Sequence, residues 1–190
     1  MPQVSSAEFR TASLLAERKP AILDGWLSDV ARDIRLRPDQ IDPSRLRHYC
    51  QDLLDELARA VSGGNLADID SSDYKGVRDL LQDLSATFAK RGLSPTDTAG
   101  IVLGLRQTLV VVLQETHPEP AELQAELAVV NRLIDRLGLL TIAAFAKARE
   151  QVIARQQEEL MELSVPVVRL WDGVLCLPIV GVLDSSRALT

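Results

Sequence analysis

The spacing of apolar residues divides the chain into a long helical part and a short end of β type. Over residues 43–61 apolar side chains recur every three or four positions, which places them on one face of a helix. These positions are Leu46, Cys50, Leu53, Leu54, Leu57 and Val61. A further helix is predicted after residue 73, with the apolar face Val77, Leu80, Leu81, Leu84 and Phe88. Beyond residue 164 the pattern changes to two short β-branched runs, 165–171 and 174–180.

Capping residues predict where the helices begin and end. Asp42-Pro43 combines an N-cap with a proline in the first helical turn. The segment Ser71-Ser72-Asp73 is predicted to cap the next helix, and Gly92 stands where a left-handed residue follows a helix end. Two shorter helices are expected before these, up to about residues 18 and 35.

The helix that Ser94-Pro95 opens has almost no polar face. We therefore expect it to be central and covered on all sides. Gly100 and Gly104, one turn apart, would let a neighbouring helix approach closely. The longest uninterrupted apolar run, Leu109 to Leu113, is far shorter than a bilayer span. No membrane-spanning segment is predicted.

The longest helical stretch runs from residue 121 to about 163. Its apolar seam has alternating spacings of four and three. The seam consists of Leu123, Leu127, Val130, Ile134, Leu137, Thr141, Ala144 and Ala148. Near Arg149 the phase changes, and the seam continues as Ile153, Gln156, Leu160 and Leu163 among charged residues. This second part has too little apolar surface for a core helix, so we interpret it as a linker that pairs with its counterpart in a homodimer.

The two β-type runs are separated by Asp172-Gly173, a strong hairpin signal. Both runs are apolar on both faces, as strands inside a larger sheet are. A lone hairpin is at best marginally stable in water. We therefore expect these residues to be the beginning of a second domain, most of which the chain does not contain, as in a truncated chain or a gene fragment.

Three stretches carry a resemblance to a known family. The run from Glu162 to Ala188, with LSVPVV, LWDGVLCLPIVG and LDSSRA, resembles the first strands of the STAS domain in RsbR-type stressosome proteins, the co-antagonists of the RsbT kinase. LAERKPAILDGW at 15–26 and RQTLVVVLQ at 106–114 resemble the N-terminal domain that some of these proteins carry.

The resemblance implies a mainly α protein with three parts: an N-terminal helical sensor and dimerisation domain (1–147), a linker helix (148–164) and the beginning of a STAS domain (165–190). Some related N-terminal domains resemble globins without haem, so a globin-like bundle is one expectation. The implied function is that of a non-enzymatic sensory and scaffold regulator. It would sequester an RsbT-type kinase together with an RsbS-type scaffold, and signal through Ile153, Leu160 and Leu163.

The resemblance also implies a phosphorylation site at Ser185. In RsbR-type proteins a Thr or Ser in the motif G-x-x-D-[ST]-x-R-A is phosphorylated by the partner kinase. The matching residues here are Gly181, Asp184, Ser185, Arg187 and Ala188. A phosphate at this strand-to-helix junction would meet free backbone N–H groups. Ser186 is the rival acceptor, and a plain helix cap is the alternative role for Asp184 or Ser185.

Composition narrows the function further. The net charge is −6, and the 21 basic residues are scattered among 27 acidic ones without a block, which argues against nucleic acid or an anionic membrane surface as partner. The N-terminus lacks the pattern of a signal peptide, so a cytoplasmic protein is expected.

Cys50 and Cys176 lie far apart and predict neither a disulfide nor a metal site. A redox-sensing Cys50 would need exposure and a lowered pKa. No arrangement of nucleophile, base or phosphate loop supports catalysis.

The alternative is a sensor module that binds haem or another small molecule. An axial haem ligand would have to be His48 or His117, but both positions read better as surface or cap residues. An EF-hand-like spacing of oxygen ligands occurs at Asp68, Asp70, Ser72 and Asp79. The loop glycine and the final glutamate are replaced, and helix capping explains this segment without a metal. No cofactor is expected.

Overall fold

The computed structural model describes residues 6–33, 41–63, 65–66, 68–116, 120–163 and 168–176. Its elements are α1 (Ser6–Glu17), α2 (Lys19–Asp33), α3 (Pro43–Val61), the short 3-10 helix η1 (Ser72–Tyr74), α4 (Lys75–Lys90), α5 (Pro95–Thr116), α6 (Pro120–Leu163), β1 (Val168–Trp171) and β2 (Val174–Cys176). The prediction of a mainly helical fold is confirmed. The chain divides into two compact units, Met1–Arg149 and Glu150–Thr190.

Two helices begin at the capping residues that the sequence predicts. Asp42 is the N-cap of α3, and its carboxylate accepts a hydrogen bond from the backbone N–H of Ser44 at 2.9 Å, which lowers the pKa of Asp42. At the start of α5 the Ser94 hydroxyl accepts from the N–H of Asp97 at 3.0 Å, and the Asp97 carboxylate accepts from the N–H of Ser94 at 3.4 Å. This reciprocal pair is a capping box, which satisfies backbone donors that a helix end leaves without partners.

The start of α4 differs from the prediction. Residues 72–74 form η1, α4 begins only at Lys75, and Ser71 makes no side-chain capping bond. The reason is that the Ser71 hydroxyl accepts a hydrogen bond from the Asn65 side chain at 2.9 Å and so belongs to the preceding loop. The end of α4 is as predicted. Gly92 follows it with a φ of 75°, a backbone conformation that suits glycine.

Trp26 of α2 anchors the core of the first unit. Its side chain is fully buried, and the indole N–H donates to the backbone carbonyl of Ile101 in α5 at 2.6 Å. Glycines let α2 and α5 approach closely. A Cβ at Gly25 would lie 2.9 Å from Cγ2 of Thr108, and one at Gly104 would lie 3.2 Å from a side-chain methyl of α2. The predicted role of Gly104 in tight packing is confirmed.

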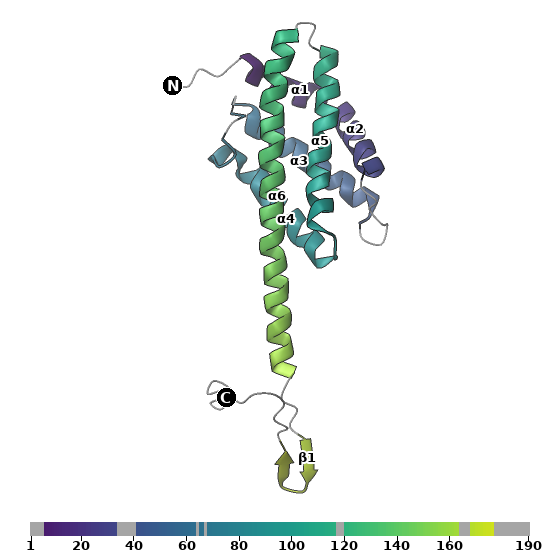
Figure 1. The fold of residues 1–190 in the computed structure, drawn as a ribbon, viewed down its shortest axis with the longest axis vertical. Helices are drawn as coiled ribbons and strands as arrows, with labels where there is room; N and C mark the ends of the chain where they lie inside the picture. Colours follow the sequence, from purple (N-terminus) through teal and green to yellow (C-terminus); the bar gives the residue numbers. More distant parts are fainter. Residues whose placement is uncertain are drawn as a thin grey trace. The chain divides into compact units, whose positions relative to one another are not determined.

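The prediction that α5 is covered on all sides is wrong. Leu103 and Val111 are 38% and 43% exposed. Helices α2 and α4 pack against α5, and the first-unit part of α6 lies beside it, where Arg106 forms an ion pair with Asp135. Figure 1 shows the other helices of the first unit behind this pair. One side of α5 therefore faces solvent, because an apolar composition does not fix how many neighbours a helix receives.

Helix α5 is also long and apolar enough to cross a membrane, by length and composition alone. The sequence predicted no membrane-spanning segment because only uninterrupted apolar runs were compared with the length of a bilayer span. A window of 18 residues tolerates the glycines and threonines between those runs. Half of this window is buried in the structure, as in the core helix of a helical bundle.

The first-unit part of α6 closes the core with the predicted seam. Seam positions that are buried or half-buried are Leu123, Leu127, Val130, Ile134, Leu137, Thr141, Ala144 and Ala148. The backbone carbonyl of Thr141 accepts a hydrogen bond from the Ser85 hydroxyl of α4 at 3.3 Å. This part of α6 thus packs as the spacing predicts.

In the second unit, β1 and β2 pair antiparallel around Asp172-Gly173. Gly173 has a φ of 79°, which the tight turn requires. The predicted hairpin is confirmed over residues 168–176, and its side chains Trp171, Val174 and Leu175 are exposed. The outer ends of the two predicted runs lie outside the described residues. Two strands this short do not by themselves establish a STAS domain.

Candidate functional site

The predicted signalling residues lie near the end of α6, in the second unit. Ile153 and Leu160 are 44% and 66% exposed, and their spacing of seven residues places them on one helix face. Their surroundings are charged, and Arg155 donates to Glu159 at 3.0 Å. Exposed aliphatic side chains on a charged helix are suited to pairing with a second helix. Of Leu163, the third predicted residue, the structure describes only the backbone.

The predicted phosphorylation site lies outside the described residues. This applies to Ser185, to its rival Ser186 and to the rest of the motif at 181–188. The role of Ser185 therefore stays a prediction from the sequence.

The histidines do not form a haem site in the described part of the chain. His48 lies exposed on α3, with its Nε2 atom 3.5 Å from the Asp52 carboxylate on the next turn. This is the surface position that the sequence favours. His117 lies outside the described residues.

The loop that resembles an EF-hand is held by hydrogen bonds to its own backbone. Asn65 Oδ1 accepts from the N–H of Asp68 at 2.9 Å, and Asp68 Oδ1 accepts from the N–H of Asp70 at 3.1 Å. The Tyr74 hydroxyl donates to the carbonyl of Asn65 at 2.7 Å. These contacts explain the polar residues as turn-forming groups. Among the described residues no group of three or more His, Cys, Asp or Glu side chains could hold a metal ion.

Cys50 has neither property that a redox sensor needs. Its side chain is buried in the core of the first unit, and this burial raises the pKa of the Cys50 thiol to about 12. The reactive thiolate is therefore disfavoured. The structure supports the interpretation of Cys50 as a small core hydrophobe.

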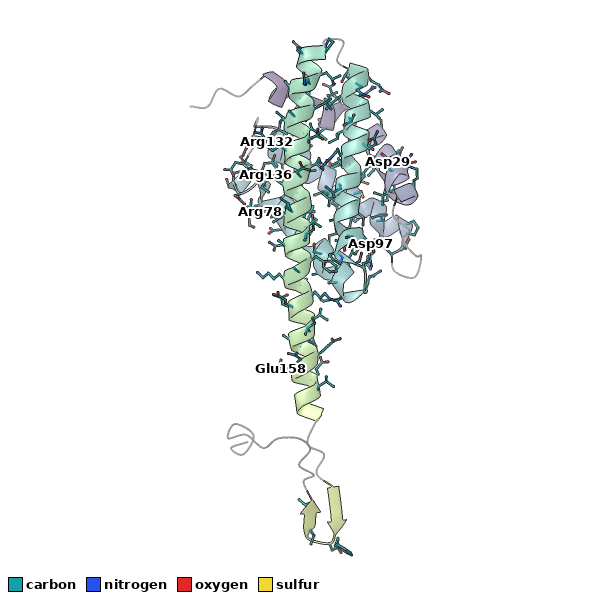
Figure 2. The ribbon with its side chains drawn as sticks, viewed as in Figure 1. Asp29, Arg78, Asp97, Arg132, Arg136 and Glu158 are labelled. Atoms are coloured by element: carbon teal, nitrogen blue, oxygen red, sulfur yellow. The ribbon has the colours of Figure 1, made fainter. Side chains whose placement is uncertain are left out.

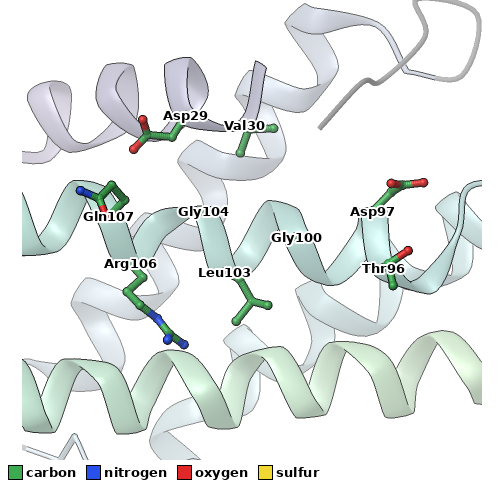
Figure 3. Close-up of a pocket in the computed structure, with 9 residues that line it drawn as sticks. All are labelled: Asp29, Val30, Thr96, Asp97, Gly100, Leu103, Gly104, Arg106 and Gln107. Carbon is green, nitrogen blue, oxygen red and sulfur yellow. The ribbon is translucent and has the colours of Figure 1, made fainter. Parts of the chain in front are cut away.

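An open groove of about 480 Å³ lies between α2 and α5 (Figure 3). Its lining residues are Asp29, Val30, Thr96, Asp97, Gly100, Leu103, Gly104, Arg106 and Gln107. All three charged side chains have partners within the first unit. Thr108 donates to Asp29 at 3.0 Å, Ser94 donates to Asp97 at 2.6 Å, and Arg106 pairs with Asp135. The groove therefore does not by itself indicate a charged ligand.

The sequence interpretation missed two exposed residues in the first-unit part of α6. Leu139 and Ile142 are 67% and 44% exposed. Beside them lies Gly138, where an added Cβ would be 2.9 Å from Cδ2 of Leu103 in α5. Leu139 and Ile142 lie off the predicted buried seam and are spaced three residues apart. That spacing was the available signal for a second helix face.

Comparison with known protein families finds a match. Residues 20–160 match the family model described as the RsbT co-antagonist protein rsbRD N-terminal domain. The match covers most of the chain, includes α3, α4 and α5 entirely, and extends along α6 past Ile153 to Leu160. No curated protein and no solved structure shows a significant match, so the globin-like form of the bundle stays a prediction.

Proposed function

Because the chain belongs to the family of RsbT co-antagonist rsbRD N-terminal domains, a regulatory rather than a catalytic family, we propose that it holds an RsbT-type kinase within a stressosome-like complex until a stimulus releases it. In this proposal the protein is cytoplasmic, dimerises, and acts with an RsbS-type scaffold. Residues 1–147 sense the stimulus, 148–164 transmit it, and 165–190 begin a STAS domain.

The observation that carries the proposal is the exposure of Ile153 and Leu160. Large aliphatic side chains on a charged helix gain free energy when a partner helix buries them. In the proposed two-helix coil the apolar seam changes phase near Arg149, which favours local changes in how the helices wind around each other. The coil is therefore a bistable element that a rearrangement in the first unit could shift.

Replacing Ile153 and Leu160 with Asp tests the linker. In cells that contain the protein, an RsbS-type scaffold and an RsbT-type kinase, the fraction of kinase held is measured before and after stress. We expect the I153D/L160D variant to release the same fraction under both conditions, because two carboxylates would separate the paired helices. A matched Q151D/A154D variant adds the same charge to other exposed positions of α6 and should respond as the wild type does. Normal release by I153D/L160D would exclude the linker as the route.

Ser185 is tested by labelling. The purified chain is incubated with an RsbT-type kinase and radiolabelled ATP, and Ser185→Ala is compared with Ser186→Ala. We expect Ser185→Ala to lose the label and Ser186→Ala to keep it. Equal labelling of the wild type and Ser185→Ala would remove Ser185 as the acceptor.

A further inference from the structure

The groove between α2 and α5 has a floor made of backbone (Figure 3). Gly100 and Gly104 lie in its middle on α5, and neither carries a side chain. The aliphatic residues Val30 of α2 and Leu103 of α5 line its walls. Glycine lets a ligand approach the backbone closely, and a volume of about 480 Å³ lies within the range of small-molecule pockets. The groove can therefore take a flat apolar group against α5.

The charged side chains around the groove are already compensated. Asp29 forms an ion pair with Arg32, and Arg106 pairs with Asp135. Asp97 belongs to the capping box of α5 and lies at the positive end of that helix dipole. Figure 2 labels the two carboxylates of the groove, on α2 and α5. An ionic ligand would lose its water without meeting an uncommitted opposite charge, so the groove favours a neutral one.

The amide of Gln107 is the polar group that the groove leaves for a ligand. Thr96 stands at the other end of the groove, and its hydroxyl lies 2.7 Å from that of Ser94 (Figure 3). The exposed Gln107 side chain, in contrast, has no hydrogen-bond partner among the described residues. A carboxamide both donates and accepts, so it pairs best with a group that does the same, such as a second carboxamide.

Two lining residues of the groove also contact α6. Leu103 packs over Gly138, where an added Cβ would lie 2.9 Å from Cδ2 of the leucine. About one turn further along α5, Arg106 pairs with Asp135. Helix α6 is the helix that continues to the predicted signalling residue Ile153. A ligand that moves the Leu103 side chain therefore changes a contact of the signalling helix.

We propose that this groove binds a neutral small molecule with a flat apolar ring and a carboxamide group. The ring lies on the glycine floor between Val30 and Leu103, and the carboxamide pairs with Gln107. In the proposed function, on which this part of the inference rests, such a ligand is the stimulus.

Three probes of one shape and different charge test the site: benzamide, benzoate and benzamidine. Their binding to the full chain is measured by saturation-transfer NMR titration. We expect benzamide to bind with a dissociation constant on the order of 1–10 mM, as a ligand of its size does. Both ions should bind at least about 10-fold more weakly. Absence of benzamide binding at its solubility limit, or equally tight binding of either ion, would overturn the proposal.

Matched variants locate the binding. Gly100→Leu fills the groove and should abolish benzamide binding, whereas Gly63→Leu adds the same side chain just after α3, where a Cβ meets nothing within 4 Å. Gln107→Leu should weaken benzamide binding about 3- to 10-fold, and Gln114→Leu, at another exposed position of α5, should not. Circular dichroism melting shows which variants are folded. Wild-type affinity in a folded Gly100→Leu variant sinks the site, and if that variant does not fold, wild-type affinity in Gln107→Leu does so.

The role of the ligand as stimulus is tested separately. In a reconstituted complex of the chain, an RsbS-type scaffold and an RsbT-type kinase, benzamide should change the fraction of kinase held by the wild type but not by Gly100→Leu. If benzamide binds and this fraction stays constant, the ligand is not the stimulus. Stress-dependent release in cells would then still support the proposed function, so the two failures are distinguishable.

Discussion

The two sides of α5 differ in the features that decide whether a helix face is covered. The side toward α2 combines a close approach at Gly25 and Gly104 with a buried indole, Trp26, whose N–H bonds to the α5 backbone. The outer side, which adjoins it, presents Leu103 and Val111 to solvent. Both sides are apolar, so hydrophobicity alone does not separate them. Small residues and a hydrogen-bonded aromatic mark the closed side, which packs within the chain, and large aliphatic residues without them mark the outer side, which stays exposed.

Disrupting the contact between α2 and α5 on the closed side should have the largest effect on stability. We expect Trp26→Ala to lower the free energy of unfolding by about 3–5 kcal/mol, because it leaves a cavity at the α2–α5 contact. Trp26→Phe keeps much of the packing but leaves the carbonyl of Ile101 without the indole donor, and should cost less. The measurement is urea denaturation followed by circular dichroism. A loss below about 1 kcal/mol for Trp26→Ala would show that this side is not the anchor of the unit.

Solvent exclusion on the closed side extends to α3 and can be measured at Cys50. A pKa of about 12 in place of 9.0 means that the thiolate fraction at pH 8 is about 1000-fold lower than for an ordinary thiol. We expect iodoacetamide to leave Cys50 unmodified in the folded chain and to alkylate it in urea. The control is Gln51→Cys at the next, exposed position, which should react at an ordinary rate. Rapid native alkylation of Cys50 would contradict its place in the core.

Local patterns in the sequence predict individual helices well. The start of α3 needs only Asp42 and the residues just after it, and its buried face follows from spacing alone. The covering of α5 could not be predicted in this way, because periodicity tells which residues share a face but not which element lies opposite. The same limit hid Leu139 and Ile142, which look like surplus apolar residues until their helix has neighbours.

The candidate site is harder to predict than the fold. The spacing of Ile153 and Leu160 predicts an exposed stripe, and the structure leaves both side chains in solvent. What such a stripe binds depends on a partner surface that one sequence does not contain. Ser185 is a more extreme case, because a serine at a helix start reads equally as a cap or as a kinase substrate.

An intermediate effect on stability is expected at Gly25, because α2 and α5 approach closely there only without a side chain. A methyl group added at Gly25 would lie 2.9 Å from Cγ2 of Thr108, so Gly25→Ala overpacks the contact at a cost of about 1–3 kcal/mol. The gain of about 1 kcal/mol in helix propensity offsets part of this, and we expect a net loss of about 1 kcal/mol. Gly76→Ala is the control, because its added methyl meets only the movable carboxylate of Glu56. Gly25→Ala should melt at a lower temperature than Gly76→Ala, and the reverse order would contradict the close approach.

The sharpest comparison of the two sides makes the same small substitution at two neighbouring residues of α5. Val112 is buried and Val111 is exposed, and replacing either valine with threonine exchanges one methyl for a hydroxyl. Burying the hydroxyl should make Val112→Thr less stable by about 1–3 kcal/mol, whereas Val111→Thr should stay within about 0.5 kcal/mol of the wild type. Urea denaturation at low protein concentration measures both costs for the monomer. Equal costs at both positions in dilute protein would mean that the outer side of α5 is not open.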